Sequence, residues 1–188
     1  MDTGVKEHLG GYMSGPHGDE ATYYPDLWTW LVEGPLQVRT VLDIGCGEGH
    51  STEFFRDLGA TVVGIDGVEQ NDPDIMRWDF TEGPLVPKSE YDLVWMCEFV
   101  EHIEEQYIHN VVPAIRTGGL VLMTHAFPGQ LGHHHVNCRT QDYWLGFMAA
   151  IGMHYSPGVT VKTREMAALN TNQYNHYLRS GLAFRNEV

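Results

Sequence analysis

Short apolar runs alternate with amphipathic segments along most of this chain. Buried strands are predicted at 41–44, 61–65, 91–96 and 120–124. A further short run, 75–79, is ambiguous. Apolar residues at helical spacing predict four helices, over 23–33, 51–58, 103–115 and 140–151. Strands and helices that alternate in this order predict a parallel sheet with helices on both faces.

The last part of the chain departs from this alternation. Two apolar stretches, 154–163 and 177–185, predict two final strands joined by a polar segment at 169–176. Because no helix is predicted between them, we expect the two strands to pair as an antiparallel hairpin at one edge of the sheet. The whole pattern therefore predicts an α/β fold with a mostly parallel sheet.

Length and composition favour one folded unit. The chain has 188 residues, of which 43% are hydrophobic and 19% charged, as is usual for a single globular domain. Residues 37–188 are expected to form its core and residues 1–36 an N-terminal segment that lies before the core. No apolar run predicts a membrane span and the N-terminus does not resemble a signal peptide, so a cytoplasmic protein is expected.

Charge and cysteine content narrow the possible partners. The net charge is −14, and this excess of acidic residues opposes binding to the phosphates of nucleic acids. The cysteines Cys46, Cys97 and Cys138 are odd in number and lack the spacing of a metal site. We therefore expect free thiols in a reducing compartment.

The segment at 41–50, V-L-D-I-G-C-G-E-G-H, is the most informative part of the chain. An apolar strand leads to Asp43 and then to glycines at every second position before a helix begins. Glycine lets a cofactor approach the bare backbone, because it has no Cβ. A dinucleotide fingerprint requires glycine three residues after Gly47, where this chain has His50. The pattern is therefore D-x-G-x-G-x-G.

An acidic residue ends the next predicted strand. Asp66 lies 17 residues after Gly49, close to the offset expected for a carboxylate that binds a ribose. The alternative is an ordinary βαβ crossover with a glycine turn and an aspartate in the following loop. The two signals at matching spacing favour a nucleoside-containing cofactor over that alternative.

This pair of signals resembles motif I and the following strand of the class I S-adenosylmethionine-dependent methyltransferases. The resemblance covers about residues 38–186 and includes the E-x-x-E-H sequence discussed below. It implies a Rossmann-like doubly wound sheet with the strand order 3-2-1-4-5-7-6, in which the seventh strand is antiparallel. The predicted final strands are similar to that reversed ending.

The resemblance also assigns cofactor-binding positions. Asp43 would hold the methionine amino group, and Asp66 would bind the ribose. In the same way, Gly45, Cys46 and Gly47 would lie against the methionine part, and Gly67 and Val68 would line the adenine. Asp79 would accept from the adenine amine beside the apolar Phe80, and Cys97 would lie beside the sulfonium. Asp79 has an alternative interpretation as an acidic residue at a strand end or turn.

The sequence C-E-F-V-E-H-I at 97–103 contains two acids and an imidazole. If a helix begins here, Glu98, Glu101 and His102 lie on one face and could form part of a Mg²⁺ or Mn²⁺ site. The same E-x-x-E-H resembles that of ubiquinone-pathway O-methyltransferases, which act on vicinal ring hydroxyls. It also resembles small-RNA 2′-O-methyltransferases, which take a further histidine from downstream. In other methyltransferases such residues orient the loop and the cofactor without a metal.

A run of three histidines follows the fifth predicted strand. On an extended segment His133 and His135 would face one way and His134 the other. We expect His134 or His135 to act as a base or metal ligand, with His134 the downstream metal ligand beside Glu98, Glu101 and His102. Asn137 would be a hydrogen-bonding partner. His102 is a further catalytic candidate, and the alternative is a surface loop that packs against Trp144.

The N-terminal segment is rich in aromatic residues. We expect it to act as a lid over the cofactor, with possible acceptor contacts from its tyrosines and histidine: Tyr12, His17, Tyr23 and Tyr24. The alternative is a helix packed on the sheet through Leu27, Trp28 and Leu31, and each interpretation can hold in a different half of the segment.

The expected function is methyl transfer from S-adenosylmethionine to a small-molecule acceptor, with S-adenosylhomocysteine as product. Oxygen is the favoured target, with either a histidine base or a divalent metal at the acceptor. The lid and the segments at 126–139 and 164–176 are expected to recognise the acceptor. The alternatives are an RNA 2′-O-methyltransferase and a cofactor-binding partner or sensor without turnover. The identity of the acceptor and the oligomeric state stay open.

Overall fold

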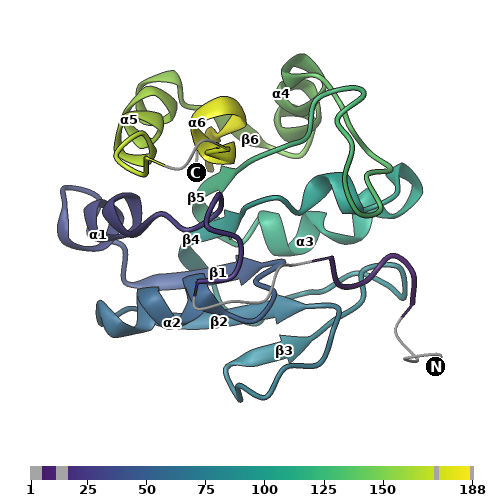
Figure 1. The fold of residues 1–188 in the computed structure, drawn as a ribbon, viewed down its shortest axis with the longest axis horizontal. Helices are drawn as coiled ribbons and strands as arrows, with labels where there is room; N and C mark the ends of the chain where they lie inside the picture. Colours follow the sequence, from purple (N-terminus) through teal and green to yellow (C-terminus); the bar gives the residue numbers. More distant parts are fainter. Residues whose placement is uncertain (1–5, 12–16, 172–173, 187–188) are drawn as a thin grey trace.

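The computed structural model describes residues 6–11, 17–171 and 174–186. They form a seven-stranded sheet in the order β3-β2-β1-β4-β5-β7-β6 (Figure 1). The strands β1 to β5 are parallel to one another, and β7 is antiparallel to both β5 and β6. The strands are β1 (Thr40–Ile44), β2 (Thr61–Asp66), β3 (Ile75–Arg77), β4 (Tyr91–Met96), β5 (Gly118–Met123), β6 (Met153–Tyr155) and β7 (Leu182–Asn186). The predicted fold class and strand order are confirmed.

Helices cover both faces of this sheet. Figure 1 shows one set of helices on one side, and α3 (Val112–Ile115) and α4 (Gln141–Ala150) on the other. The first set is α1 (Pro25–Glu33), α2 (His50–Asp57), α5 (Pro157–Ala167) and α6 (His176–Ser180). The central strands contribute alternate residues to the two cores: in β4, Leu93 and Trp95 pack on the α1 side, and Val94 and Met96 on the α4 side. Burial on both faces explains why these strands are apolar throughout.

The helix predicted over 103–115 is wrong in its extent. The chain instead forms two 3-10 turns, η1 (Val100–His102) and η2 (Glu105–Asn110), followed by the single helical turn of α3. Pro113 lies in the first turn of α3. Because proline has no backbone N–H, a helix that began near residue 103 could not run through this position without losing a hydrogen bond.

The predicted terminal hairpin is also wrong. Residues 157–167 form the helix α5, and α6 precedes β7, so two helices separate β6 from β7, although these strands do pair. Threonines and valines in 159–163 suggested a strand. Pro157 instead occupies the first turn of a helix, where proline is well tolerated, and Thr160, Thr163 and Ala167 form its buried face.

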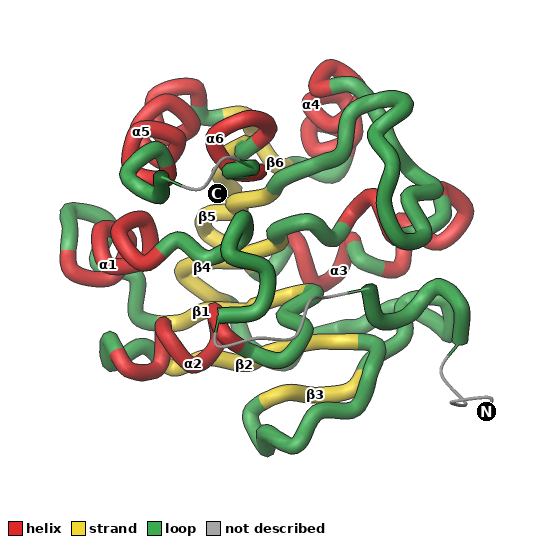
Figure 2. Tube along the Cα trace, viewed as in Figure 1, coloured by secondary structure: helices red, strands yellow, loops and turns green. Residues whose placement is uncertain are grey.

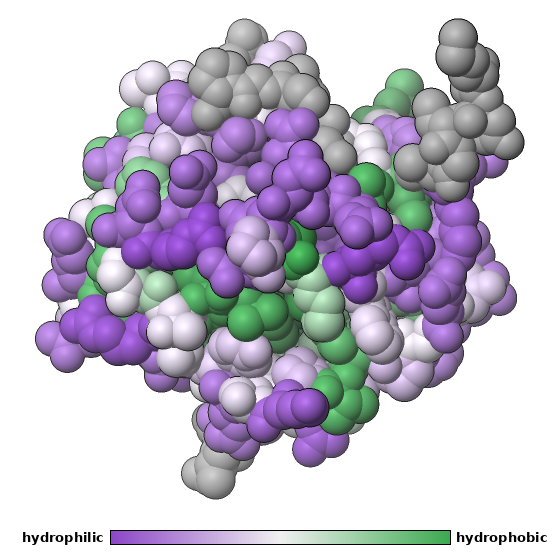
Figure 3. Space-filling view, turned by 90° about the horizontal axis from the view of Figure 1, so that it is seen from below, coloured by the Kyte–Doolittle hydropathy of each residue, from purple (hydrophilic) through white to green (hydrophobic). Residues whose placement is uncertain are grey.

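The ambiguous run at 75–79 forms the short edge strand β3. Met76 of this strand is 40% exposed. Figure 3 shows the molecule from below, where hydrophobic residues gather in the middle of the surface with polar residues around them. A strand of only three residues limits the open edge that another chain could pair with.

The parallel arrangement brings the carboxyl ends of β1, β2 and β4 to one edge of the sheet. Figure 2 shows loops gathered at this edge, with part of the N-terminal stretch crossing in front of them. Ligands of open α/β sheets bind at such an edge. In the described part of the chain, none of the helices combines the length and apolar character that crossing a bilayer requires.

Candidate functional site

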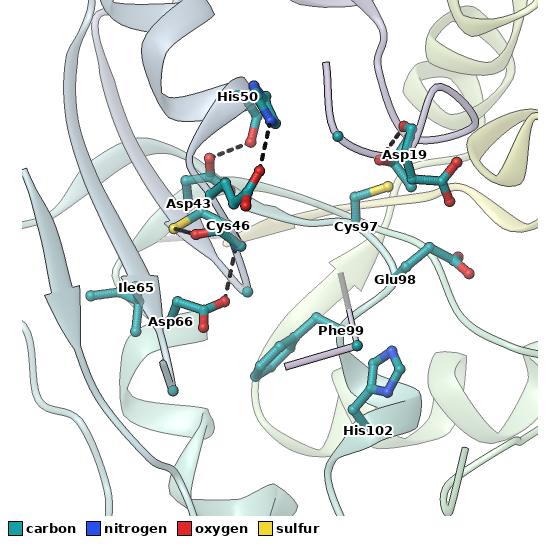
Figure 4. A pocket seen from close by; sticks show the side chains of 18 of the residues that line it. Asp19, Asp43, Cys46, His50, Ile65, Asp66, Cys97, Glu98, Phe99 and His102 are labelled. Atoms are coloured by element: carbon teal, nitrogen blue, oxygen red, sulfur yellow. Dashed lines mark hydrogen bonds and ion pairs between the residues drawn. The ribbon is translucent and has the colours of Figure 1, made fainter. Parts of the chain in front are cut away.

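A cavity of about 200 Å³ lies at this edge of the sheet. Its walls come from the loops after β1, β2 and β4 and from the N-terminal stretches at 8–11 and 17–23. In Figure 4, Asp43, Cys46 and Asp66 lie toward one side, and Asp19, Glu98 and His102 toward the other. All the predicted cofactor residues line this cavity except Val68: Asp43, Gly45, Cys46, Gly47, Asp66, Gly67, Asp79, Phe80 and Cys97.

The glycine loop has the backbone shape that its sequence predicts. Gly45, Gly47 and Gly49 have φ angles of 76°, 56° and 88°, in the left-handed region that favours glycine. A Cβ at Gly45 would lie 2.6 Å from a ring carbon of Phe99. The glycine loop therefore packs directly against the loop that follows β4. The N–H groups of Gly45 and Cys46 both donate to the carbonyl of Ile65. These bonds fix the loop against β2.

Asp66 joins the two halves of the motif. Its carboxylate accepts from the Gly47 N–H at 2.9 Å and from the Val68 N–H at 2.8 Å. Burial raises the pKa of this carboxyl, while the backbone donors act in the opposite direction. Val68 therefore acts on the site through its backbone and is absent from the described lining of the cavity.

Asp43 is the most deeply buried acid of the glycine loop, with 1% of its surface exposed. One of its oxygens accepts from the Ser51 hydroxyl at 2.6 Å and from the Thr52 hydroxyl at 2.8 Å. Burial raises the pKa of Asp43 to about 6, and the two hydroxyl donors limit that rise. The carboxyl therefore changes charge close to neutral pH.

The pH dependence of cofactor binding follows from Asp43. Above pH 6 its carboxylate is ionised and attracts an ammonium group, whereas below pH 6 it is protonated and this attraction is lost. We expect the affinity for S-adenosylhomocysteine to fall by up to about tenfold from pH 7 to pH 5. Calorimetric titrations at both pH values measure this change. The variant Asp43→Asn should show a flat profile, and an equal fall in variant and wild type would contradict the prediction.

The far end of the cavity holds Asp79 and Phe80. The Asp79 carboxylate accepts from Lys6 Nζ at 2.7 Å and from the Thr81 N–H and hydroxyl, and it lies 3.1 Å from His8 Nε2. Burial alone would raise the pKa of this carboxyl, but the donors outweigh burial and hold the pKa well below its usual range. Lys6 and His8 were not predicted as site residues, since nothing local in the sequence links them to Asp79.

The N-terminal stretch also covers Gly67. A Cβ at this glycine would lie 2.3 Å from a methyl carbon of Leu9, so Leu9 packs directly on its backbone. His17 and Tyr23 stack with ring centroids 4.3 Å apart and line the cavity, while Leu27, Trp28 and Leu31 are buried. His17 and Tyr23 thus border the cavity while the following helix packs on the sheet, and closure of this segment over a cofactor stays a prediction. Tyr12 lies outside the described residues.

Cys97 lies between the glycine loop and Glu98 in the cavity (Figure 4). Its thiol is 3.9 Å from the Thr124 hydroxyl. Burial raises the pKa of this thiol well above its usual value, and the charge of Glu98 adds to the effect. A thiol held in its protonated form is a poor nucleophile, which suits a residue that only borders the site.

The prediction that Glu98, Glu101 and His102 share one helical face is wrong, because Glu98 lies before the helical turn. It precedes η1 with a φ of 50°, so its side chain leaves the backbone before the turn begins. Its carboxylate accepts from the Thr124 hydroxyl at 2.8 Å and lies 3.1 Å from His176 Nδ1. His176 was not predicted as a site residue.

Glu101 and His102 instead meet His135. One potential ligand atom from each residue lies within 4.8 Å of the others. Glu101 is fully buried, and neither of its carboxylate oxygens has a hydrogen-bond partner among the described residues. Burial, with the charge of Glu98, raises the pKa of Glu101 well above its usual value. Burial and the neighbouring His135 lower the pKa of His102 to about 4.

The histidine loop is not extended. His134 has a φ of 43° and lies in a turn, yet the three rings still divide between two directions. The centroid of the His102 ring is 5.0 Å from that of His135 and 6.5 Å from that of His133, whereas the His134 ring is 6.0 Å from that of His8. The predicted metal ligands Glu98 and His134 therefore lie outside the three-residue group. Asn137 accepts from Arg139 Nε at 3.0 Å.

A family model described as a methyltransferase domain matches residues 20–164, which is most of the chain. The chain belongs to the class I S-adenosylmethionine-dependent methyltransferase family. The predicted resemblance is confirmed at this level. The match includes the glycine loop, Asp66, Asp79 and the E-x-x-E-H sequence.

Relatives of this methyltransferase-family chain include the ubiquinone biosynthesis O-methyltransferase of Methylobacterium nodulans, 30% identical over 46% of the chain. The mitochondrial ubiquinone biosynthesis O-methyltransferase of Rattus norvegicus is 33% identical over 53% of it. The matched stretches cover only 40% and 34% of those two proteins. The chain thus spans well under two thirds of the length of these curated relatives.

Solved structures show the same fold. The 1,6-didemethyltoxoflavin-N1-methyltransferase of Burkholderia thailandensis, with bound 1,6-didemethyltoxoflavin and S-adenosylhomocysteine, has a TM-score of 0.63. It is 14% identical and aligns over 90% of this chain and 80% of that one. The magnesium protoporphyrin IX methyltransferase of Synechocystis PCC 6803, with bound S-adenosylmethionine, has a TM-score of 0.58 at 15% identity, over 87% and 77% of the two chains.

Proposed function

We propose that this protein transfers a methyl group from S-adenosylmethionine to a hydroxyl of a small molecule. The observation that carries the proposal is one cavity that contains both the glycine loop with Asp43 and Asp66 and, at its other side, Glu98 and His102. A cofactor in the first part would present its methyl group to an acceptor in the second. The relatives named as O-methyltransferases support oxygen as the target.

The charge of the cavity supports a cationic cofactor. Six acids line it, and neither lysine nor arginine occurs among its described lining residues: Asp19, Asp43, Glu48, Asp66, Asp79 and Glu98. S-adenosylmethionine carries a sulfonium and an ammonium group, so these carboxylates would attract it. The product has lost the sulfonium charge, and this loss would favour its release.

The reaction asks mainly for positioning. Methyl transfer from a sulfonium is an in-line displacement, so much of the rate comes from holding the acceptor oxygen opposite the leaving sulfur. The buried Asp43 and the half-buried Asp66 would fix the two ends of the methionine–ribose part of the cofactor. Phe99, in direct contact with Gly45, would close the side of the cavity that faces the acceptor.

The group Glu101, His102 and His135 fits a divalent cation. A buried carboxylate with two unpaired oxygens is costly unless it is protonated or bound to a cation, and His102 Nδ1 is also buried without a partner among the described residues. With one carboxylate and two imidazoles, these donors suit Mn²⁺ better than Mg²⁺. When bound, such a cation lowers the pKa of a nearby hydroxyl. If no cation binds, His102 would be the candidate base, because it lines the cavity and His134 and His135 are not among the described lining residues.

Two measurements test this proposal. Incubation with S-adenosylmethionine and catechol should yield S-adenosylhomocysteine and a methyl ether. Turnover would separate an enzyme from a binding protein, and its absence with catechol and other hydroxyl acceptors would contradict O-methylation.

Titration of Mn²⁺ into protein saturated with S-adenosylhomocysteine tests the cation. We expect one-to-one binding that Glu101→Gln weakens by about tenfold or more, because the variant loses the charged ligand. Glu90→Gln is the matched control, since Glu90 is exposed and lies just before β4, at the opposite end of that strand from the cavity. Equal binding by the two variants would contradict the assignment.

A further inference from the structure

Three side chains from distant parts of the sequence meet on the acceptor side of the cavity. His176 Nδ1 lies 3.1 Å from a Glu98 oxygen, and His176 Nε2 lies 3.9 Å from an Asp19 oxygen. Asp19 and Glu98 line the cavity, whereas His176 is not among its described lining residues and stands behind them. The His176 ring is thus within hydrogen-bond distance of Glu98, whereas its separation from Asp19 is longer than a hydrogen bond.

Glu98 is held in an unusual conformation. Its φ of 50° is uncommon for a residue with a side chain, and such residues are concentrated at functional sites. The buried Thr124 hydroxyl accepts from the Glu98 N–H at 2.6 Å and donates to its carboxylate at 2.8 Å. His176 occupies the other carboxylate oxygen. Both oxygens are therefore fixed by residues from other elements.

The backbone around His176 is itself anchored. Asn175 caps α6, because its side chain accepts from the Leu178 N–H at 2.9 Å. The Tyr177 N–H donates to the Tyr24 hydroxyl at 2.9 Å, and the Tyr177 ring stacks on Trp95 at 5.3 Å. These contacts join α6 to the N-terminal segment and to β4. His176 therefore projects from a rigid support.

The N-terminal segment is tied to the same support on the other side. The Asp19 side chain accepts from the Ala21 N–H at 2.9 Å, which fixes the turn that carries it. The Ala21 carbonyl then accepts from the His176 N–H. Asn170 Nδ2 also donates to the Tyr23 carbonyl at 2.6 Å. The position of Asp19 thus depends on Asn170 and His176.

We propose that His176 is a positioning residue for the methyl acceptor. Its ring holds the Glu98 carboxylate, and its backbone N–H holds the turn that carries Asp19, so that both carboxylates can accept hydrogen bonds from the methyl acceptor. This inference rests on the proposed methyl-transfer function. A carboxylate pair of this kind favours a neutral or cationic acceptor that carries hydroxyl or amine donors. It disfavours an anionic acceptor, because no lysine or arginine is among the described lining residues to offset the charge.

The test uses catechol as the acceptor probe and 3,4-dihydroxybenzoate as its anionic counterpart. In the wild type we expect catechol to be the better substrate in kcat/KM. His176→Ala should raise the KM for catechol by about tenfold, as expected when a hydrogen bond to a charged group is lost. The dissociation constant of S-adenosylhomocysteine should stay within about twofold, since the His176 ring and backbone N–H contact Asp19, Glu98 and Ala21, and none of the described contacts of His176 is to the glycine loop.

Two further variants separate positioning from folding. His176→Gln keeps a side-chain donor for Glu98 and should recover part of the KM loss. Asp19→Asn removes one charge and should narrow the preference for catechol over 3,4-dihydroxybenzoate. His154→Gln is the control, because His154 is exposed on the edge strand β6 and should behave as the wild type.

The outcomes distinguish this inference from the proposed function. An unchanged KM in His176→Ala, or an equal loss of S-adenosylhomocysteine affinity, would overturn the role of His176. If the wild type binds catechol in calorimetry without methylating it, O-methylation of catechols fails, and weaker binding by His176→Ala would still support the inference. If the wild type neither binds nor methylates either probe, both proposals fail.

Discussion

Replacement of Asp66 by alanine is expected to weaken the binding of S-adenosylhomocysteine by about a hundredfold or more. The Asp66 carboxylate lines the cavity and accepts from the Gly47 and Val68 N–H groups. In the proposed complex it also accepts from the two ribose hydroxyls. The variant therefore loses both the ligand contacts and the support of the glycine loop, and calorimetric titration measures the combined effect.

Two control variants accompany this measurement. Asp66→Asn keeps the size of the side chain but not its charge and should lose less affinity than alanine. Asp57→Ala removes an exposed aspartate at the end of α2 and should bind as the wild type does. Thermal unfolding checks that each variant is folded. Affinity within about threefold of the wild type in a folded Asp66→Ala protein would contradict the ribose assignment.

Replacement of Trp95 by alanine is expected to lower the free energy of unfolding by about 3–5 kcal/mol. Trp95 is only 2% exposed and stacks on Tyr177 with the rings 9° from parallel. Its edge contacts reach Tyr24 and Trp28. The residue lies in the middle of β4, so its removal would leave a cavity between the sheet and the helices that carry His176 and the N-terminal segment.

Urea unfolding monitored by circular dichroism measures this loss. Trp95→Phe keeps most of the ring contacts and should lose clearly less stability than alanine. Trp30→Ala is the matched control, because Trp30 is only half-buried and packs at the margin of the same cluster. A Trp95→Ala protein as stable as Trp30→Ala would show that the aromatic cluster does not support the site as described.

The cofactor half of the site could be predicted from sequence because its geometry is local. Three glycines at alternate positions permit the left-handed backbone that the loop adopts, and Asp66 follows at the distance of one helix and one strand. A short stretch of chain therefore contains both the glycine loop and Asp66, whose carboxylate accepts a hydrogen bond from that loop. The order of the strands was predicted from the family resemblance, whereas the alternation of strands and helices indicated only a mostly parallel sheet.

The errors in secondary structure have a common cause. Thr160 and Thr163 favour strands by propensity, but their burial on one face of α5 and the helical start at Pro157 decided the outcome. At 103–115 the apolar spacing suited a helix, and Pro113 interrupted it. In both places a single proline carried more information than the pattern of apolar residues around it.

The acceptor half could not be predicted in the same detail, because its contacts join distant segments. Lys6 is 73 positions from Asp79, and the partner of Glu98 is His176, in the last helix. The sequence drew attention to Glu101, His102 and the histidine run. It could not indicate that the turn at His134 would bring His135, rather than His134, to Glu101 and His102.

The most direct test of the central proposal is calorimetric titration of S-adenosylhomocysteine into the wild-type protein at pH 7.5. We predict one-to-one binding with a dissociation constant of about 1–100 μM, in the range of ordinary cofactor sites. A mixture with an equimolar amount of S-adenosylmethionine should show competition for the same site. No binding by a folded protein at about 1 mM ligand would contradict the assignment of this cavity to S-adenosylmethionine.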